Sequence, residues 1–160
     1  MFTEKSCTVV YSLDREIKVV GVNLQKSGLL ISFDSLGELW GVYGEKYRGK
    51  VENRAIPQVE YAVCLNKALD YIAGCEVTEI GEMDEGWLSF IIPPGKYIKD
   101  TFSAETFELL VTEELGKRNV KGWAKENGVK IDEAFSVEVY PIEAVEGTNV
   151  EMYTLTPVKG

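Results

Sequence analysis

The sequence contains no histidine, so carboxylates, tyrosine hydroxyls and three cysteines are the first side chains to consider for chemistry. Without an imidazole, neither a Ser-His-Asp or Cys-His nucleophile nor an HExxH zinc site can be assembled. Cys7, Cys64 and Cys75 are far apart and form no CxxC pair, which gives no support to a zinc site or a redox pair. We therefore expect no metal and no cofactor, and we interpret the cysteines as small buried hydrophobes in a reducing cytosol.

A carboxylate and a phenol share one face of a predicted strand at residues 136–140. Alternation places Glu138 and Tyr140 on one face, and Val137 and Val139 on the other. If the valines pack under helices, the polar face looks into a cleft. There a carboxylate would attract a cation by roughly 4 kcal/mol at an effective dielectric near 20, and each aromatic wall would add about 0.5–2 kcal/mol through cation–π contact. A glutamate on a strand is more often solvated, so this chemistry depends on the surrounding fold.

The elements that must position these residues follow the same order twice along the chain. Each half is expected to have two strand segments, a helix and two more strand segments. The predicted strands are residues 7–11, 17–22, 60–65 and 71–77 in the first half, and 87–92, 96–99, 136–140 and 150–155 in the second. Turn-forming residues at 14–16 and 93–95 separate the first two strands of each half.

Apolar residues at three- and four-residue spacing predict the helices. The first begins at a capping-box match formed by Ser35 and Glu38. Its apolar stripe is Leu36, Leu39, Trp40, Tyr43 and Tyr47. In the second half, Ser103 can cap a helix whose apolar residues are Phe107, Leu110, Val111 and Leu115. A shorter helix over 120–127 should end at Gly128 in the left-handed conformation.

Together these patterns predict an α+β fold in a single domain, residues 1–160, built from duplicated β-α-β-β modules at about 7–80 and 85–158. Neither module could bury a sufficient core alone, so the two should share one antiparallel sheet with helices on one face. A cleft between the two halves is then the expected ligand site.

The net charge of −9, from 17 basic and 26 acidic residues, argues against polyanionic partners. Binding to DNA, RNA or an anionic membrane needs clustered lysine and arginine, so we expect neither direct nucleic-acid binding nor membrane binding. No apolar stretch is long enough to span a bilayer, and the first residues lack a secretory signal pattern. These features favour a cytoplasmic protein.

Five short strings carry a resemblance to a known family. They are residues 71–77 (YIAGCEV), 92–97 (IPPGKY), 102–105 (FSAE), 137–140 (VEVY) and 150–153 (VEMY). In their order and spacing they resemble the gyrase-inhibitor-like (GyrI-like) family, which includes the effector-binding domains of AraC-type and MerR-type multidrug regulators. The resemblance implies the duplicated β-α-β-β fold, and binding of bulky hydrophobic, often cationic aromatic molecules between the modules.

The resemblance also implies roles for particular residues. Glu138 occupies the position of a glutamate that contacts the ligand cation in the regulators, and Phe102 and Phe107 match aromatic positions that line the pocket. The other predicted ligand-binding residues are Tyr140, Trp40, Tyr61 and Trp87, for which packing in the core is the alternative role. The sequence has no counterpart of the regulators' N-terminal helix-turn-helix, so a stand-alone small-molecule-binding module is expected.

Two other functions stay open at this point. Some stand-alone members of the family that this chain resembles hydrolyse strained electrophiles, and Glu138 would then be the general base, aided by Tyr140 or Tyr97. The acidic chain could instead bind a basic protein partner, as the gyrase inhibitors of that family do. Glu76 could form an acid–base pair with Glu138, although a solvated strand residue is the simpler interpretation.

Overall fold

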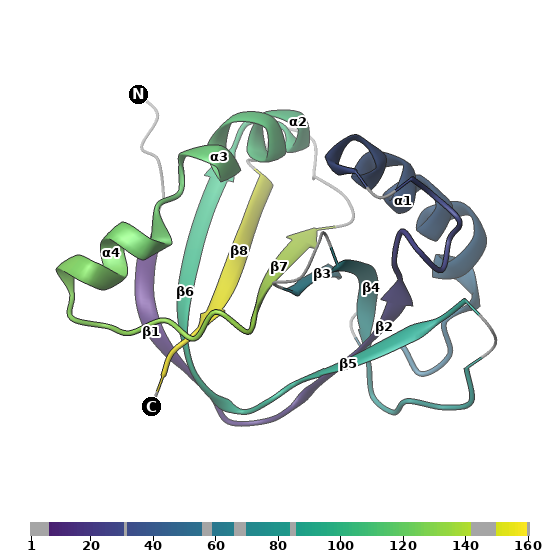
Figure 1. Ribbon diagram of the computed structural model, residues 1–160, viewed down its shortest axis with the longest axis horizontal. Coiled ribbons are helices and arrows are strands. Elements are labelled where there is room, and N and C mark those ends of the chain that lie inside the picture. The colour runs from purple at the N-terminus through teal and green to yellow at the C-terminus, as the bar shows by residue number, and fades with distance from the viewer. Residues whose placement is uncertain are drawn as a thin grey trace.

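The computed structural model describes residues 7–30, 32–55, 59–65, 70–83, 86–141 and 150–159. Over these residues the chain forms the predicted α+β architecture, one eight-stranded antiparallel sheet with helices on one face (Figure 1). The strands are β1 (Cys7–Leu13), β2 (Ile17–Val22), β3 (Val59–Leu65), β4 (Asp70–Val77), β5 (Leu88–Ile92), β6 (Gly95–Ala104), β7 (Phe135–Pro141) and β8 (Val150–Pro157). Their order across the sheet is β1-β6-β8-β7-β3-β4-β2-β5.

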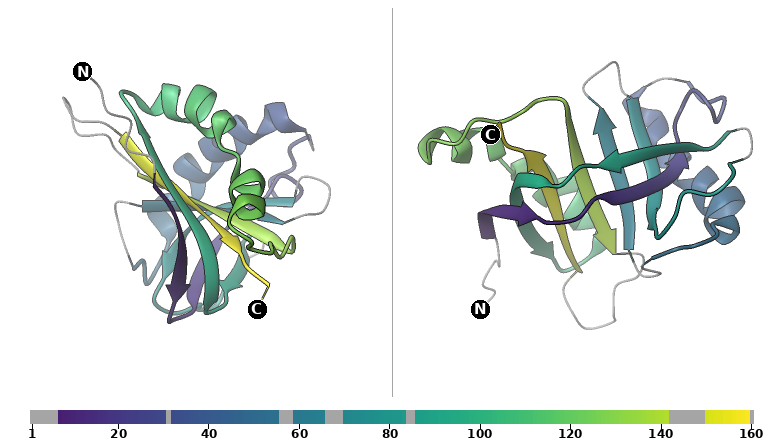
Figure 2. Two further views of the ribbon diagram at one scale, coloured as in Figure 1. Left: turned by 90° about the vertical axis from the view of Figure 1, so that its left-hand side faces the viewer. Right: turned by 90° about the horizontal axis from the view of Figure 1, so that it is seen from below.

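The first two strands of each half do not form hairpins. β1 pairs with β6, while β2 pairs with β5 on one side and with β4 on the other. Leu13 faces Gly95 and Ile17 faces Ile92, so the segment 14–16 lies opposite the two prolines that precede Gly95. The expected turns are therefore bends in a long two-stranded ribbon, which crosses the central strands in Figure 2. By contrast, β3 pairs with β4 and β7 with β8 as predicted.

Two helical regions cover the same face of the sheet (Figure 1). The first consists of η1 (Phe33–Ser35), α1 (Leu36–Val42), the π-helical turn η2 (Tyr43–Tyr47) and η3 (Arg48–Lys50). The second consists of α2 (Phe107–Leu109), the π-helical turn η4 (Leu110–Glu114) and α3 (Leu115–Lys117), and is followed by α4 (Val120–Glu126). In the part of the chain that the structure describes, no helix has the length and apolar character needed to cross a membrane.

The helix ends differ in part from the predicted caps. Ser35 has helical backbone angles, and its hydroxyl lies 3.0 Å from that of Ser32 instead of accepting a helix amide, so the capping box does not form. Ser103 lies within β6, and it is the Thr106 hydroxyl that accepts the amide of Leu109 at 3.1 Å. Gly128 has φ 67°, the left-handed conformation expected at the end of the short helix.

The central strands are buried on both faces. Val137 and Val139 belong to a cluster with Tyr61, Val63 and other apolar residues on the face turned away from the helices. The bent ribbon covers that face and shields it from water. The odd-numbered side chains of β7 therefore pack there. The even-numbered side chains of β7 face the helices. The premise that the valines pack under the helices is therefore wrong, although the polar face does look toward the helical layer.

Candidate functional site

Glu138 lies near the middle of the sheet, on the face that the helices cover. In the strand register it is opposite Ala62 of β3 on one side and Thr154 of β8 on the other. Its carboxylate accepts a hydrogen bond from the Tyr140 hydroxyl and lies 3.9 Å from the Cys64 sulfur. The strand alternation thus brings Glu138 and Tyr140 together, as predicted, because residues two apart share a face.

An aromatic cluster adjoins this carboxylate. Trp40 of α1 makes edge-to-face contacts with Tyr43, Tyr71 and Tyr140, at ring-centroid distances of 5.8, 6.4 and 5.9 Å. The indole nitrogen of Trp40 donates to the Tyr71 hydroxyl at 2.8 Å. Of the predicted wall residues, Trp40 and Tyr140 meet here, joining the first helical region to β7. Tyr71 was missed as a member of this cluster; its place on β4, on the same face as Ala73, was the available signal.

Burial dominates the electrostatics around Glu138. It raises the pKa of the Glu138 carboxyl above its ordinary value, although hydrogen bonds from Tyr140 and Cys64 act in the opposite direction. Burial also raises the pKa of the Tyr140 hydroxyl, and the neighbouring Glu138 charge raises it further. For the same two reasons the pKa of the Cys64 thiol rises to about 12. Among the described residues, no lysine or arginine nitrogen lies within 4.0 Å of the Glu138 carboxylate.

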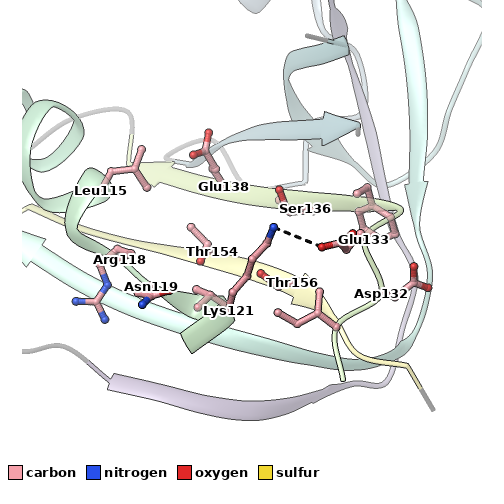
Figure 3. A pocket seen from close by; sticks show the side chains of 14 residues that line it. Leu115, Arg118, Asn119, Lys121, Asp132, Glu133, Ser136, Glu138, Thr154 and Thr156 are labelled. Atoms are coloured by element: carbon pink, nitrogen blue, oxygen red, sulfur yellow. Dashed lines mark ion pairs between the residues drawn. The ribbon is translucent and has the colours of Figure 1, made fainter. Parts of the chain in front are cut away.

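A cavity of about 400 Å³ lies beside Glu138, between β7–β8 and the segment from α3 to α4 (Figure 3). Its apolar lining includes Leu115, Val120 and Ile131. Phe135 and Val137 of β7 also border it, although their side chains pack in the cluster on the opposite face. Its polar lining is Ser136, Glu138, Thr154, Thr156 and Asn119, together with Arg118, Lys121, Asp132 and Glu133. All these residues come from the second half, so the chamber lies on one side of the line where the halves meet. A chamber of this volume that combines apolar side chains with placed polar groups is suited to a small organic molecule.

The two cations in this lining already have acidic partners. Arg118 binds Asp100 through two hydrogen bonds, of 2.8 Å from Nε and 2.6 Å from a terminal nitrogen. Lys121 lies 3.4 Å from Glu133, and both side chains are mostly exposed at the mouth of the chamber (Figure 3). Neither cation is paired with Glu138, which lines the chamber together with two other carboxylates, Asp132 and Glu133.

The structure does not bring the other predicted wall residues to Glu138. Tyr61 lies on the opposite face of β3, because it alternates with Ala62, and it donates to Glu76 at 3.3 Å. Trp87 packs edge-to-face on Tyr47, with ring centroids 4.9 Å apart, and lines a separate cavity of about 320 Å³. These two aromatic side chains serve other parts of the molecule.

The two predicted phenylalanines lie in the second half. Phe102 is fully buried on the helix-covered face, with the Arg118 guanidinium 5.1 Å from its ring centroid. It packs beneath the arginine that holds Asp100 and is not part of the chamber lining. Phe107 begins α2, and its side chain lies outside the described part of the structure.

Glu76 is not a solvated strand residue, contrary to the interpretation from sequence. It is 5% exposed and pairs with Arg15 at 2.5 Å. It also accepts the Tyr61 hydroxyl on the face away from the helices, so it forms no carboxylate pair with Glu138. The arginine lies far from Glu76 in sequence, which is why the pattern of β4 alone gave no sign of this pair.

The structure also tests which tyrosine could assist Glu138 as a general base. Tyr97 donates to the Pro93 carbonyl at 2.5 Å and packs in the cluster on the far face, so it cannot assist Glu138. Only Tyr140 of the two proposed helpers contacts the carboxylate. Among the described residues there is no group of three or more Cys, Asp or Glu side chains that could hold a metal ion.

Comparisons with known proteins agree with this architecture. The family described as integron-associated effector binding protein (Cass2) matches residues 16–154. The transcriptional regulator BrlR of Pseudomonas aeruginosa is 26% identical over 122 residues, which is 71% of this chain. The match covers 45% of that regulator, so the chain spans less than half of the length of this curated relative.

Solved structures show the same fold at low sequence identity. An integron cassette protein from the mobile metagenome of Vibrio cholerae superposes with a TM-score of 0.57 at 12% identity, over 95% of each chain. The C-terminal domain of EcmrR superposes with a TM-score of 0.63 at 14% identity, over 99% of each chain. The predicted resemblance to GyrI-like effector-binding domains is confirmed.

Proposed function

The chain belongs to the integron-associated effector-binding protein family, and from that premise we propose that it binds hydrophobic cations, with Glu138 as the anionic anchor. The body of the ligand occupies the chamber beside β7 and β8. The Trp40–Tyr71–Tyr140 cluster fixes the position of the carboxylate from the other side.

One observation carries the proposal: among the described residues, Glu138 has no cationic partner, whereas the fully buried carboxylates do. Glu60, Glu76 and Asp100 are 3%, 5% and 1% exposed, and each is paired with at least one arginine. Glu138 has a tyrosine and a thiol instead, and it forms part of a cavity wall. A carboxylate in this setting gains most when the ligand itself brings the positive charge.

The energies favour a cation over a neutral ligand of the same shape. Contact between opposite charges contributes roughly 4 kcal/mol at an effective dielectric near 20. A neutral molecule in the chamber would cut the carboxylate off from water without replacing that hydration. The apolar lining, by contrast, makes no fixed demand on the shape of the ligand body. The site should therefore select for charge more strictly than for outline.

Isothermal titration with 4-phenylbutylammonium and with the neutral 4-phenylbutanol tests the proposal. Glu138→Gln should weaken binding of the ammonium by about 10- to 100-fold, because a charge-assisted hydrogen bond is lost, and should leave the alcohol almost unaffected. Glu126→Gln is the matched control, since it removes the same charge from an exposed position on α4. Equal affinity of wild type and Glu138→Gln for the ammonium would refute the anchor.

A further inference from the structure

A row of polar side chains crosses the sheet at the level of Glu138. In the strand register, Asp100 of β6 is opposite Thr154 of β8, and Thr154 is opposite Glu138 of β7. Side chains that face each other in an antiparallel pair have Cβ atoms about 4.5–5.5 Å apart. Thr154 therefore lies within reach of any head group that binds Glu138.

The two neighbours of Thr154 differ in how far their hydrogen-bonding capacity is used. Asp100 uses most of its acceptor capacity, because it accepts two hydrogen bonds from Arg118 and a third from the Thr8 hydroxyl at 2.8 Å. Glu138 accepts from Tyr140 and makes a long contact with Cys64, which leaves acceptor sites on its two oxygens.

The Thr154 hydroxyl oxygen is buried and has no hydrogen-bond partner among the described residues. Leaving a buried hydroxyl unpaired costs free energy, so polar atoms in such positions nearly always have a partner in the functional state. Thr154 lines the same chamber as Glu138, and the hydroxyl-bearing Ser136 and Thr156 line it as well (Figure 3). Next to the carboxylate, the floor of the chamber thus offers acceptors for hydrogen-bond donors.

Resting on the function proposed above, we infer that the site selects ammonium groups that carry N–H bonds, with Thr154 as the specificity-determining residue. A primary ammonium has three N–H donors, which Glu138 and the Thr154 hydroxyl can accept together. A quaternary ammonium has the same charge but no donor. Its methyl groups would cover the hydroxyl without satisfying it, and a site with a buried polar group discriminates against such a ligand.

The rest of the chamber defines the class of ligand. Leu115, Val120 and Ile131 give an apolar surface for the body of the molecule. The volume, about 400 Å³, falls within the range of small-molecule sites. The preferred ligand is therefore an amphipathic primary or secondary amine, with one charged end and an aromatic or aliphatic body.

The test compares 4-phenylbutylammonium with 4-phenylbutyl-trimethylammonium by isothermal titration to wild type, Thr154→Val and Thr154→Ser. Wild type should bind the primary amine about tenfold more tightly, as expected for one well-placed hydrogen bond to a charged donor. Thr154→Val keeps the shape and removes the hydroxyl, so the preference should fall to near unity, through weaker binding of the primary amine. Thr154→Ser keeps the hydroxyl and should keep the preference. Thermal denaturation of each variant confirms that it is folded.

Each outcome separates this inference from the proposed function. Equal binding of both probes by wild type, or an equal loss of both in Thr154→Val, would overturn the role of Thr154. If Glu138→Gln still weakens both probes in that case, the anionic anchor stands without the inference. Failure of both probes to bind wild type would overturn the anchor and the inference together.

Discussion

Glu138 and Glu60 lie on the same face of neighbouring strands, yet the protein surrounds them differently. Glu60 of β3 is 3% exposed and accepts from the Tyr43 hydroxyl at 2.9 Å, Arg48 Nε at 2.7 Å and Arg54 at 3.0 Å. Glu138 of β7 accepts a hydrogen bond from Tyr140, lies 3.9 Å from the Cys64 sulfur and lines a cavity. The fold can thus neutralise an enclosed carboxylate with its own arginines. Where it does not, the charge is available to a ligand.

Breaking the internal pair should produce the largest effect. Glu60→Gln removes the anion that two guanidinium groups surround, and disrupting a buried ion pair from one side costs about 3–5 kcal/mol. We expect a loss of this size in the free energy of unfolding, measured by urea denaturation. A loss below about 1 kcal/mol would mean that the Glu60 network is screened like a surface pair.

The same substitution at Glu138 should have the opposite sign. Burial disfavours the charged carboxylate, so Glu138→Gln should stabilise the unliganded protein at neutral pH by about 1 kcal/mol. A carboxyl whose folded pKa is raised contributes stability that is fully present below the ordinary value of 4.5 and is lost as the pH rises through the folded value. The advantage of the glutamine variant should therefore appear over that window and vanish at lower pH. Urea denaturation of both proteins across the pH range measures this difference.

Ligand binding should follow the same titration. A cation favours the ionised carboxylate, so affinity for 4-phenylbutylammonium should increase as the pH rises through the raised pKa of Glu138, with release of a proton. Titrations in buffers of different ionisation enthalpy detect that proton. In Glu138→Gln, the pH dependence should disappear.

Cys64 offers a chemical reporter of the Glu138 charge. Its thiol has a pKa of about 12, first because of burial and then because of Glu138, whereas Cys7 is exposed. Iodoacetamide at pH 8 should therefore alkylate Cys7 well before Cys64, because the thiolate is the nucleophile. Glu138→Gln should speed alkylation of Cys64 severalfold, as followed by peptide mass spectrometry. An unchanged rate would show that burial alone protects the thiol.

The pair at the mouth of the chamber should have the smallest effect. Lys121 and Glu133 are 80% and 68% exposed, and such ion pairs contribute about 0–1 kcal/mol. Lys121→Gln should leave the melting temperature nearly unchanged. A clear destabilisation would mean that this pair has a structural role comparable with that of the Glu60 network.

The sequence predicted correctly that Glu138 and Tyr140 share one face of β7, but it assigned the helix-covered face to Val137 and Val139, which lie on the opposite face. Alternation assigns Glu138 and Val137 to opposite faces, but it cannot say which face the helices cover when both are buried. The far face is shielded from water because the ribbon covers it. The ribbon depends on the pairing of β1 with β6, which are far apart in sequence, and local turn residues do not predict that pairing. The position of Tyr61 was predictable: Ala62 is opposite Glu138 in the register, so the adjacent Tyr61 must lie on the other face of the sheet.

Long-range charge pairing limited the prediction in the same way. Arg15 pairs with Glu76, and Arg48 and Arg54 pair with Glu60. These arginines lie on loops and a helical turn outside β3 and β4. Nothing in the strand patterns distinguishes these glutamates from Glu138. That distinction required the three-dimensional structure, and the proposed function depends on it.

The ribbon formed by β1–β2 and β5–β6 also restricts how a guest can enter. Its backbone hydrogen bonds join the first half to the second at both ends of the ribbon, so we expect no large hinge motion between the halves. Admission should depend on small displacements of α4 and the side chains at its rim. The ligand-bound protein should then have the same overall shape as the free protein. Binding should reduce local motion around the chamber instead of closing a hinge.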